Sequence, residues 1–208
     1  MKNIFKEISS EQKKINNKIL QRLKDGNKRF VDNKLNDQNY KEQIKETANG
    51  QFPFAAVLGC IDSRVPAEIV FDQGIGDLFN VRIAGNFVND DILGSLEFAC
   101  KVAGSKIIVV LGHTSCGAIK GACDNVQLGK LTGMLDNISP AIAEVHGNYL
   151  DRSSANTQYV QEVAETNVKL TVKAIYERSE ILKEMIKTGE VSIVGAMYDV
   201  STGKVSFK

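Results

Sequence analysis

The stretches FAAVLGC (residues 54–60) and IIVVLGH (residues 107–113) are built alike: five apolar residues run into a glycine, and a cysteine or histidine follows. Runs that are apolar on both faces are typical of parallel strands covered by helices on both sides. Residues 78–83 and 191–197 are two further candidate strands. These four runs predict a mainly parallel central sheet.

The segments between these runs carry helical signals. Residues 10–34 read as a polar amphipathic helix, residues 35–50 as a connection or a second short helix, and residues 90–103 and 155–188 as further helices. Asn89 is a suitable N-cap, and Gly104 and Gly189 are suitable stops. Strands that alternate with helices predict an α/β fold. We expect one domain over residues 1–208, with an N-terminal helical arm (1–50) and an α/β core (51–208).

Composition excludes several classes of protein. The chain has 208 residues, of which 43% are hydrophobic, and a net charge of +1. It is long enough to bury a core, and its charge favours neither nucleic acid nor an anionic membrane as a partner. It has no apolar run long enough to span a membrane and no signal-peptide core at its start. We therefore expect a cytoplasmic protein, while a processed periplasmic form stays open.

The cysteine and the histidine at the two strand ends are candidate metal ligands. Ligands of open α/β sheets gather beyond the carboxyl ends of the strands, so Cys60 and His113 meet there if their strands are neighbours. Cys116 follows His113 by three residues and can turn back to the same point. Two thiolates and one imidazole suit zinc, and three protein ligands leave the fourth position open, as in catalytic sites. Chance or core packing is the alternative reading of H-x-x-C alone.

A carboxylate and a guanidinium follow the first ligand in the segment CIDSR (residues 60–64). In a turn at the strand end, Asp62 can approach the metal while the Arg64 guanidinium forms a bidentate pair with the Asp62 carboxylate. An ionised carboxylate held in this way can accept a hydrogen bond from a metal-bound water. The alternative reading is an ordinary surface ion pair, which contributes little.

Residues 60–86 (CIDSRVPAEIVFDQGIGDLFNVRIAGN) and 111–121 (LGHTSCGAIKG) resemble the β-class carbonic anhydrases, and the resemblance extends over residues 18–207. It implies that Cys60, His113 and Cys116 bind zinc and that Asp62 and Arg64 form the catalytic dyad. It implies reversible hydration of carbon dioxide to bicarbonate and a proton by zinc-bound hydroxide. The residues that it implies for the substrate pocket are Gln51, Phe79, Ala84, Phe98 and Gly117.

The resemblance also carries expectations about assembly and resting state. It implies a homodimer or homotetramer, with a small-molecule substrate and no nucleic-acid or membrane partner. In part of the family the aspartate itself closes the zinc site, often in members with a tryptophan in a noncatalytic bicarbonate pocket. This chain has no tryptophan. We therefore expect an open site at neutral pH, with Asp62 bound to Arg64.

Two other functions fit the same motifs. A hydrolase of carbon disulfide or carbonyl sulfide shares this zinc motif. A noncatalytic protein that binds zinc or bicarbonate is the second alternative, although a purely structural site has no need of Asp62 and Arg64. The pattern Gly74-Ile75-Gly76 lacks the third glycine of a dinucleotide-binding motif and precedes a candidate strand, so we expect no nucleotide cofactor.

Overall fold

The computed structural model describes residues 10–208 and contains a five-stranded sheet in the order β2-β1-β3-β4-β5. Strands β1 to β4 are parallel and β5 runs antiparallel to β4. The strands are β1 (Ala55–Gly59), β2 (Leu78–Arg82), β3 (Ile107–His113), β4 (Ser192–Tyr198) and β5 (Val205–Phe207). The predicted α/β fold with a mainly parallel sheet is therefore confirmed.

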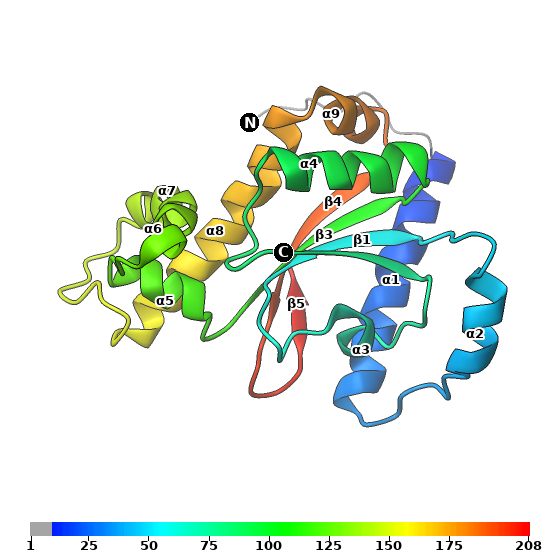
Figure 1. Cartoon of the computed structure of the whole chain (residues 1–208), viewed down its shortest axis with the longest axis horizontal. Coiled ribbons are helices and arrows are strands. Elements are labelled where there is room, and N and C mark those ends of the chain that lie inside the picture. Colours follow the sequence, from blue (N-terminus) through cyan, green and yellow to red (C-terminus); the bar gives the residue numbers. More distant parts are fainter. Residues whose placement is uncertain (1–9) are drawn as a thin grey trace.

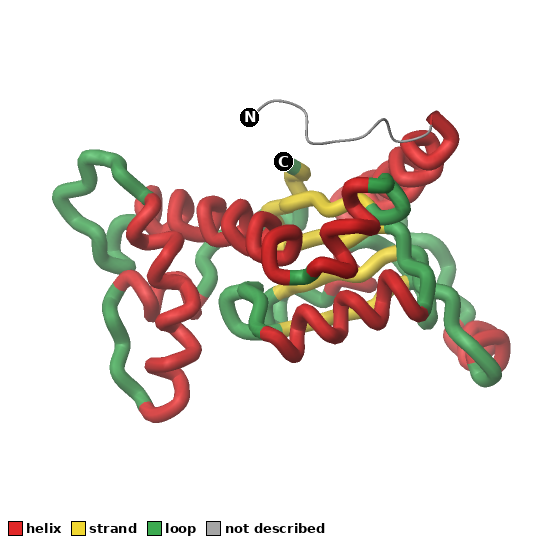
Figure 2. The backbone as a smooth tube through the Cα atoms, turned by 90° about the horizontal axis from the view of Figure 1, so that it is seen from above, coloured by secondary structure: helices red, strands yellow, loops and turns green. Residues whose placement is uncertain are grey.

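Helices cover both faces of this sheet (Figures 1 and 2). The helix α8 continues beyond the sheet, where its first half packs against α5 and α7 in a separate group of short helices (Figure 1). The helices are α1 (Ser10–Val31), α2 (Tyr40–Thr47), α3 (Ala67–Val70), α4 (Asp90–Glu97) with a π-helical turn (Phe98–Val102), α5 (Gly117–Cys123), α6 (Gly129–Leu135) with a 3₁₀ turn (Asp136–Ile138), α7 (Ser139–Glu144), α8 (Thr157–Arg178) and α9 (Glu180–Lys187).

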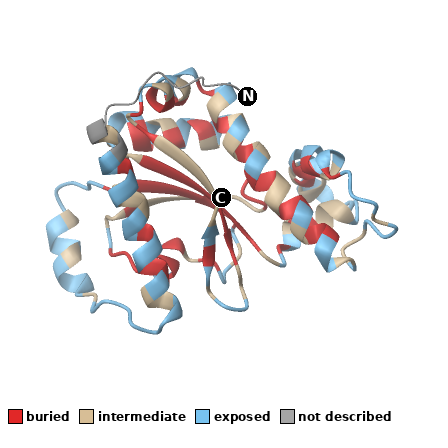
Figure 3. Ribbon diagram, turned by 180° about the vertical axis from the view of Figure 1, so that it is seen from behind, coloured by how far each residue is buried: buried red, intermediate tan, exposed pale blue. Residues whose placement is uncertain are grey.

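Two neighbouring interior strands, β1 and β3, are buried along their whole length (Figure 3). Their side chains alternate between two hydrophobic cores. Ala56 and Leu58 enter the core formed with α4, α8 and α9, whereas Ala55 and Val57 enter the core formed with α1 and α3. Burial on both faces explains why these strands are continuous apolar runs in the sequence.

The N-terminal helix α1 packs against its own chain. Leu23 is 0% exposed, in the core that α1 and α3 form with one face of the sheet. Asn27 donates hydrogen bonds to the carbonyls of Val70 and Gly203 and accepts one from the backbone of Val205. A Cβ atom at Gly26 would stand 1.8 Å from the Phe71 carbonyl oxygen, so only glycine permits this close approach of α1 to the end of α3. The predicted N-terminal helix is thus present and joined to the core by buried contacts.

The structure refines the predicted elements at two places. The helical stretch 155–188 is two helices, because Ser179 ends α8 and caps α9, accepting a hydrogen bond from the Leu182 backbone. The strand β5 was not predicted, since three residues with only alternate burial give little periodic signal. Within residues 10–208, no helix has the length and apolarity that a membrane span requires.

Candidate metal centre

The register of the sheet brings Cys60 and His113 to the same edge. Gly59, the last residue of β1, pairs with Leu111 of β3, and His113 ends β3 two residues later. Cys60 follows Gly59 directly, so both side chains stand at the carboxyl ends of neighbouring parallel strands. This is the edge at which open α/β sheets bind ligands.

A tight turn returns Cys116 to the same point. Ser115 adopts a left-handed backbone conformation, with φ at 54°, which reverses the chain after β3. The Thr114 backbone N–H donates to the Tyr198 carbonyl, so the turn is tied to the end of β4. Cys116 then immediately precedes α5 and is 1% exposed.

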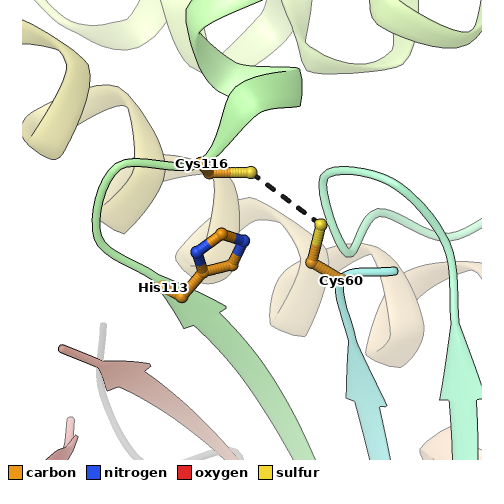
Figure 4. A group of neighbouring side chains, drawn as sticks. All are labelled: Cys60, His113 and Cys116. Atoms are coloured by element: carbon orange, nitrogen blue, oxygen red, sulfur yellow. Dashed lines mark hydrogen bonds between the residues drawn. The ribbon is translucent and has the colours of Figure 1, made fainter. Parts of the chain in front are cut away.

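The three candidate ligand atoms face one another (Figure 4). The sulfurs of Cys60 and Cys116 and a ring nitrogen of His113 all lie within 4.8 Å of one another. The Sγ atoms of the two cysteines are 3.9 Å apart. Two sulfurs bound at about 2.3 Å to a tetrahedral ion stand about 3.8 Å apart. The donor set and its spacing therefore fit zinc, and the site could hold a metal ion.

His113 presents one nitrogen to the cysteines and has the other occupied. Its Nδ1 lies 2.9 Å from the Thr114 carbonyl oxygen, which can only accept, so Nδ1 carries the proton. The lone pair then resides on Nε2. This atom is buried and has no hydrogen-bond partner within the described part of the chain. Because a buried polar atom without a partner is costly, its orphaned state points to a ligand that the ring is oriented to bind.

Electrostatics at the two cysteines favour one negative charge shared between them. The hydrogen bond from Cys116 lowers the pKa of Cys60 most, burial opposes this shift, and the Gly85 N–H lowers the pKa further. The Gly85 N–H lies 3.4 Å from the Cys60 sulfur. The pKa of Cys116 is raised, because its thiol is hydrogen-bonded to Cys60 and is buried. Removing the second proton needs a cation at this place, as a zinc ion would provide.

Asp62 and Arg64 lie beside this set. Arg64 Nε is 2.9 Å from Asp62 Oδ1, and Arg64 Nη2 is 2.7 Å from Oδ2. These bonds hold the pKa of the Asp62 carboxyl well below its usual range. Asp62 Oδ2 is also 3.9 Å from His113 Nε2, so the carboxylate faces the candidate ligands. The motif CIDSR thus forms a compact loop that sets an ionised carboxylate next to the metal position.

The structure separates the five predicted pocket residues into two groups. Ala84 and Gly117 adjoin the centre, because Ala84 precedes Gly85 and Gly117 follows Cys116. Phe79 pairs with Ala56, at the other end of the strand from Cys60. Phe79 contacts Phe98 edge-on, with ring centroids 6.1 Å apart, and the two line a hollow outside β2. Gln51 is exposed and precedes β1, so one chain does not bring these last three residues to the metal edge.

Sequence reasoning missed residues that support the ligands through the backbone. Arg82 ends β2 and donates hydrogen bonds to the carbonyls of Cys60 and Asp62. Asn167 of α8, which is buried, donates to the Gly85 carbonyl at 2.7 Å. Arg82 could have been found, because it is a charged residue at the carboxyl end of a strand. Asn167 gave no signal, since it is one polar residue within a long helix.

A family model and two sequence relatives all match most of this chain. The family described as carbonic anhydrase matches residues 55–205. The chain is 37% identical over 190 residues to carbonic anhydrase 2 of Mycobacterium tuberculosis, covering 88% of this chain and 87% of that protein. It is 38% identical over 188 residues to a carbonic anhydrase of Mycolicibacterium smegmatis, covering 89% of this chain and 90% of that protein.

Solved structures agree with the sequence relatives. The β-carbonic anhydrase CafA of Aspergillus fumigatus superposes with a TM-score of 0.72 at 30% identity, covering 81% of each chain. A tetrameric β-carbonic anhydrase of Sordaria macrospora has a TM-score of 0.71 at 24% identity, covering 80% of this chain and 89% of that one. At that identity the second likeness concerns the fold alone.

Proposed function

This chain belongs to the β-carbonic anhydrase family and is a carbonic anhydrase, and we propose that it hydrates carbon dioxide reversibly at a zinc ion held by Cys60, His113 and Cys116. Zinc bound there would supply a Lewis acid that brings the pKa of a water molecule to about 7. The thiols and the imidazole nitrogen supply three ligands. In the described part of the chain no fourth cysteine, histidine or carboxylate joins this group, which leaves room for water or substrate.

The proposed part of Asp62 is to accept a hydrogen bond from the reacting water and fix its direction. Its Oδ2 atom faces the ligand set, and its low pKa keeps it ionised throughout the physiological range. Arg64 holds both carboxylate oxygens, so Asp62 cannot rotate away. A positioned acid–base group of this kind contributes roughly 10²–10⁴-fold to a rate.

One observation carries the metal proposal: the buried Nε2 of His113 has no partner in the described residues and faces two thiols 3.9 Å apart. The test is stopped-flow hydration of carbon dioxide by protein whose zinc content has been measured, with carbonyl sulfide as a comparison substrate. We expect fast hydration that disappears on removal of zinc. Turnover of carbonyl sulfide without hydration would assign the hydrolase activity instead, and zinc binding without either activity would indicate a noncatalytic protein.

We also propose that the protein works as a homodimer or homotetramer. The outer side of β2 has no neighbouring strand in the described sheet, Phe98 lies in the hollow beside it, and the chain exposes further large apolar side chains. Phe52 is 88% exposed, Val102 72% and Phe98 51%. Phe98 contacts Phe79 of β2, and exposed apolar side chains at an unpaired strand are a feature of interaction surfaces. If Gln51, Phe79 and Phe98 line a substrate pocket, a second copy has to bring them to a metal edge.

A cytoplasmic location is part of the proposal. Two of the three proposed ligands are thiols, and a reducing compartment keeps such thiols available to a metal. The substrate class is carbon dioxide and bicarbonate, and the near-zero net charge of the chain supports no nucleic-acid partner.

A further inference from the structure

Arg82 bridges two carbonyls of the loop that carries Cys60 and Asp62. It is the last residue of β2 and pairs in register with Gly59, the last residue of β1. From there its Nε lies 2.8 Å from the Cys60 carbonyl oxygen, and its Nη2 lies 2.6 Å from the Asp62 carbonyl oxygen. We propose that Arg82 is a positioning residue that fixes the proposed metal ligand and the proposed catalytic carboxylate relative to each other, an inference that rests on the proposed function.

The backbone of this loop makes few other hydrogen bonds, although the Asp62 side chain is held by Arg64 and the Cys60 sulfur accepts one from the Gly85 N–H. Residues 60–66 lie between β1 and α3 and form no regular structure. Its turn is closed by one backbone hydrogen bond, from the Val65 N–H to the Asp62 carbonyl. In residues 10–208 the Cys60 carbonyl has no donor other than Arg82. Removing the guanidinium would therefore leave the Cys60 carbonyl without a donor and remove the link between the Cys60 and Asp62 backbone carbonyls.

The planar guanidinium suits this task. Its donors form a rigid fork, and hydrogen bonds from a charged donor are stronger than neutral ones. The two carbonyls that it binds stand on either side of Ile61, so the fork fixes the backbone between the ligand and the carboxylate. Arg64 differs from Arg82, because Arg64 bonds to the carboxylate of Asp62 itself. The hydrogen bonds of Arg82 go to backbone carbonyls and not to the side chains of Cys60 or Asp62, so it acts through the backbone.

Arg82 also borders the hollow outside β2, and a role there would have different consequences. An arginine that only attracted bicarbonate, or only bound a second copy, would change KM or the oligomeric state. It would leave the metal ligands as they are. A positioning residue has to alter the affinity and the coordination geometry of the metal itself.

The test compares Arg82→Gln with a matched control, Arg152→Gln. Arg152 likewise donates to two backbone carbonyls, those of Ile142 in α7 and of Val145 directly after it, but these lie outside the ligand-bearing segments. For the wild type and both variants, the zinc dissociation constant is measured by chelator competition, and the cobalt-substituted protein is examined by its visible absorption spectrum. Stopped-flow hydration gives kcat and KM.

We expect Arg82→Gln to raise the zinc dissociation constant by about 10–100-fold, the usual effect of losing a group that orients a metal ligand. The cobalt spectrum should shift, and kcat should fall while KM stays within about twofold of the wild type. Arg152→Gln should leave the metal measurements unchanged. Wild-type affinity and an unchanged cobalt spectrum in Arg82→Gln would overturn the proposal, as would an equal loss in Arg152→Gln.

Arg82→Lys keeps the inference testable if Arg82→Gln does not fold. Its ammonium group cannot present the rigid fork that reaches both carbonyls, so an intermediate zinc affinity is expected, and wild-type affinity would contradict the proposal. The metal measurements do not depend on catalysis. An inactive wild-type protein would therefore contradict the proposed function and still leave the role of Arg82 decided by zinc affinity.

Discussion

The side chains of Asp62 and Arg64 form a two-pronged ion pair, with contacts of 2.9 and 2.7 Å between the guanidinium and the two carboxylate oxygens. The backbone N–H of Arg64 adds a third bond, 3.0 Å from Oδ1. Three donors from one residue fix the carboxylate in a single orientation. The orientation of the Asp62 carboxylate toward the metal position is therefore set by Arg64.

The dyad is open to direct test by substitution. We expect Asp62→Asn to keep its zinc and to lose about 10²–10⁴-fold in kcat, because an amide accepts hydrogen bonds more weakly and carries no charge. Arg64→Ala should cause a similar loss by freeing Asp62. Stopped-flow assays and zinc analysis of the same samples measure both effects.

The matched control is Asp32→Asn. Asp32 follows α1 directly and also pairs with a basic side chain, Lys28, but both side chains are exposed. Its variant should show wild-type turnover. Near-normal turnover in both dyad variants would mean that the pair has no role beyond structure.

The proposed ligand set predicts one zinc ion per chain with two sulfurs and one histidine nitrogen. X-ray absorption should give distances of about 2.3 Å to sulfur and about 2.0–2.1 Å to nitrogen. Cys60→Ala should lose the metal, because the two remaining ligands bind it too weakly. Cys123→Ala should retain it, since Cys123 lies outside the ligand group. Four sulfurs in the absorption spectrum, or full zinc retention in Cys60→Ala, would disprove this assignment.

The contacts of α1 predict that it contributes to stability. Leu23 is 0% exposed, so the substitution Leu23→Ala should lower the free energy of unfolding by about 2–5 kcal/mol. Leu128→Ala makes the same chemical change at a residue that is 66% exposed, and it should cost about 0.5 kcal/mol or less. Denaturant unfolding measures both. Equal effects would show that α1 does not pack on the sheet in solution.

The strands and the residues at their carboxyl ends could be predicted from the sequence, because short local patterns specify them. Apolar runs, continuous in β1 and β3, predicted the four parallel strands, and the similar ends of those two predicted that Cys60 and His113 meet, which the register of β1 and β3 confirms. The spacing of Asp62 and Arg64 predicted their pairing, because a short turn leaves two such side chains little choice.

Other features depend on contacts between distant segments. Arg82 approaches the Cys60 carbonyl only because β2 pairs with β1 in a particular register. Asn167 meets Gly85 across 82 positions of sequence. The separation of Phe79 from the metal edge follows from its place along β2, which a motif alone does not specify. Such relations arise from the tertiary structure and leave no periodic signal.

The apolar surface beside β2 predicts an oligomer that one charged side chain can disrupt. Phe98→Asp would place a carboxylate in a buried interface, so the protein should sediment as smaller species than the wild type does. Leu150→Asp is the control, because Leu150 is fully exposed in the loop between α7 and α8. Analytical ultracentrifugation should show the wild-type assembly for this variant. A monomeric wild type would contradict the proposed assembly altogether.

The ion pair between Asp62 and Arg64 finally predicts an open metal site at neutral pH. A carboxylate that became a fourth zinc ligand would occupy the position that water needs, and it would have to give up its bonds to Arg64. Three donors from Arg64 hold Asp62 in place, and its Oδ2 stands 3.9 Å from His113 Nε2 without entering the ligand group. A crystal structure of the zinc-loaded protein near neutral pH should therefore show water or a small anion as the fourth ligand, with Asp62 still on Arg64. An Asp62 oxygen at about 2.0–2.2 Å from zinc, with Arg64 released, would contradict this and assign the chain to the members whose site closes.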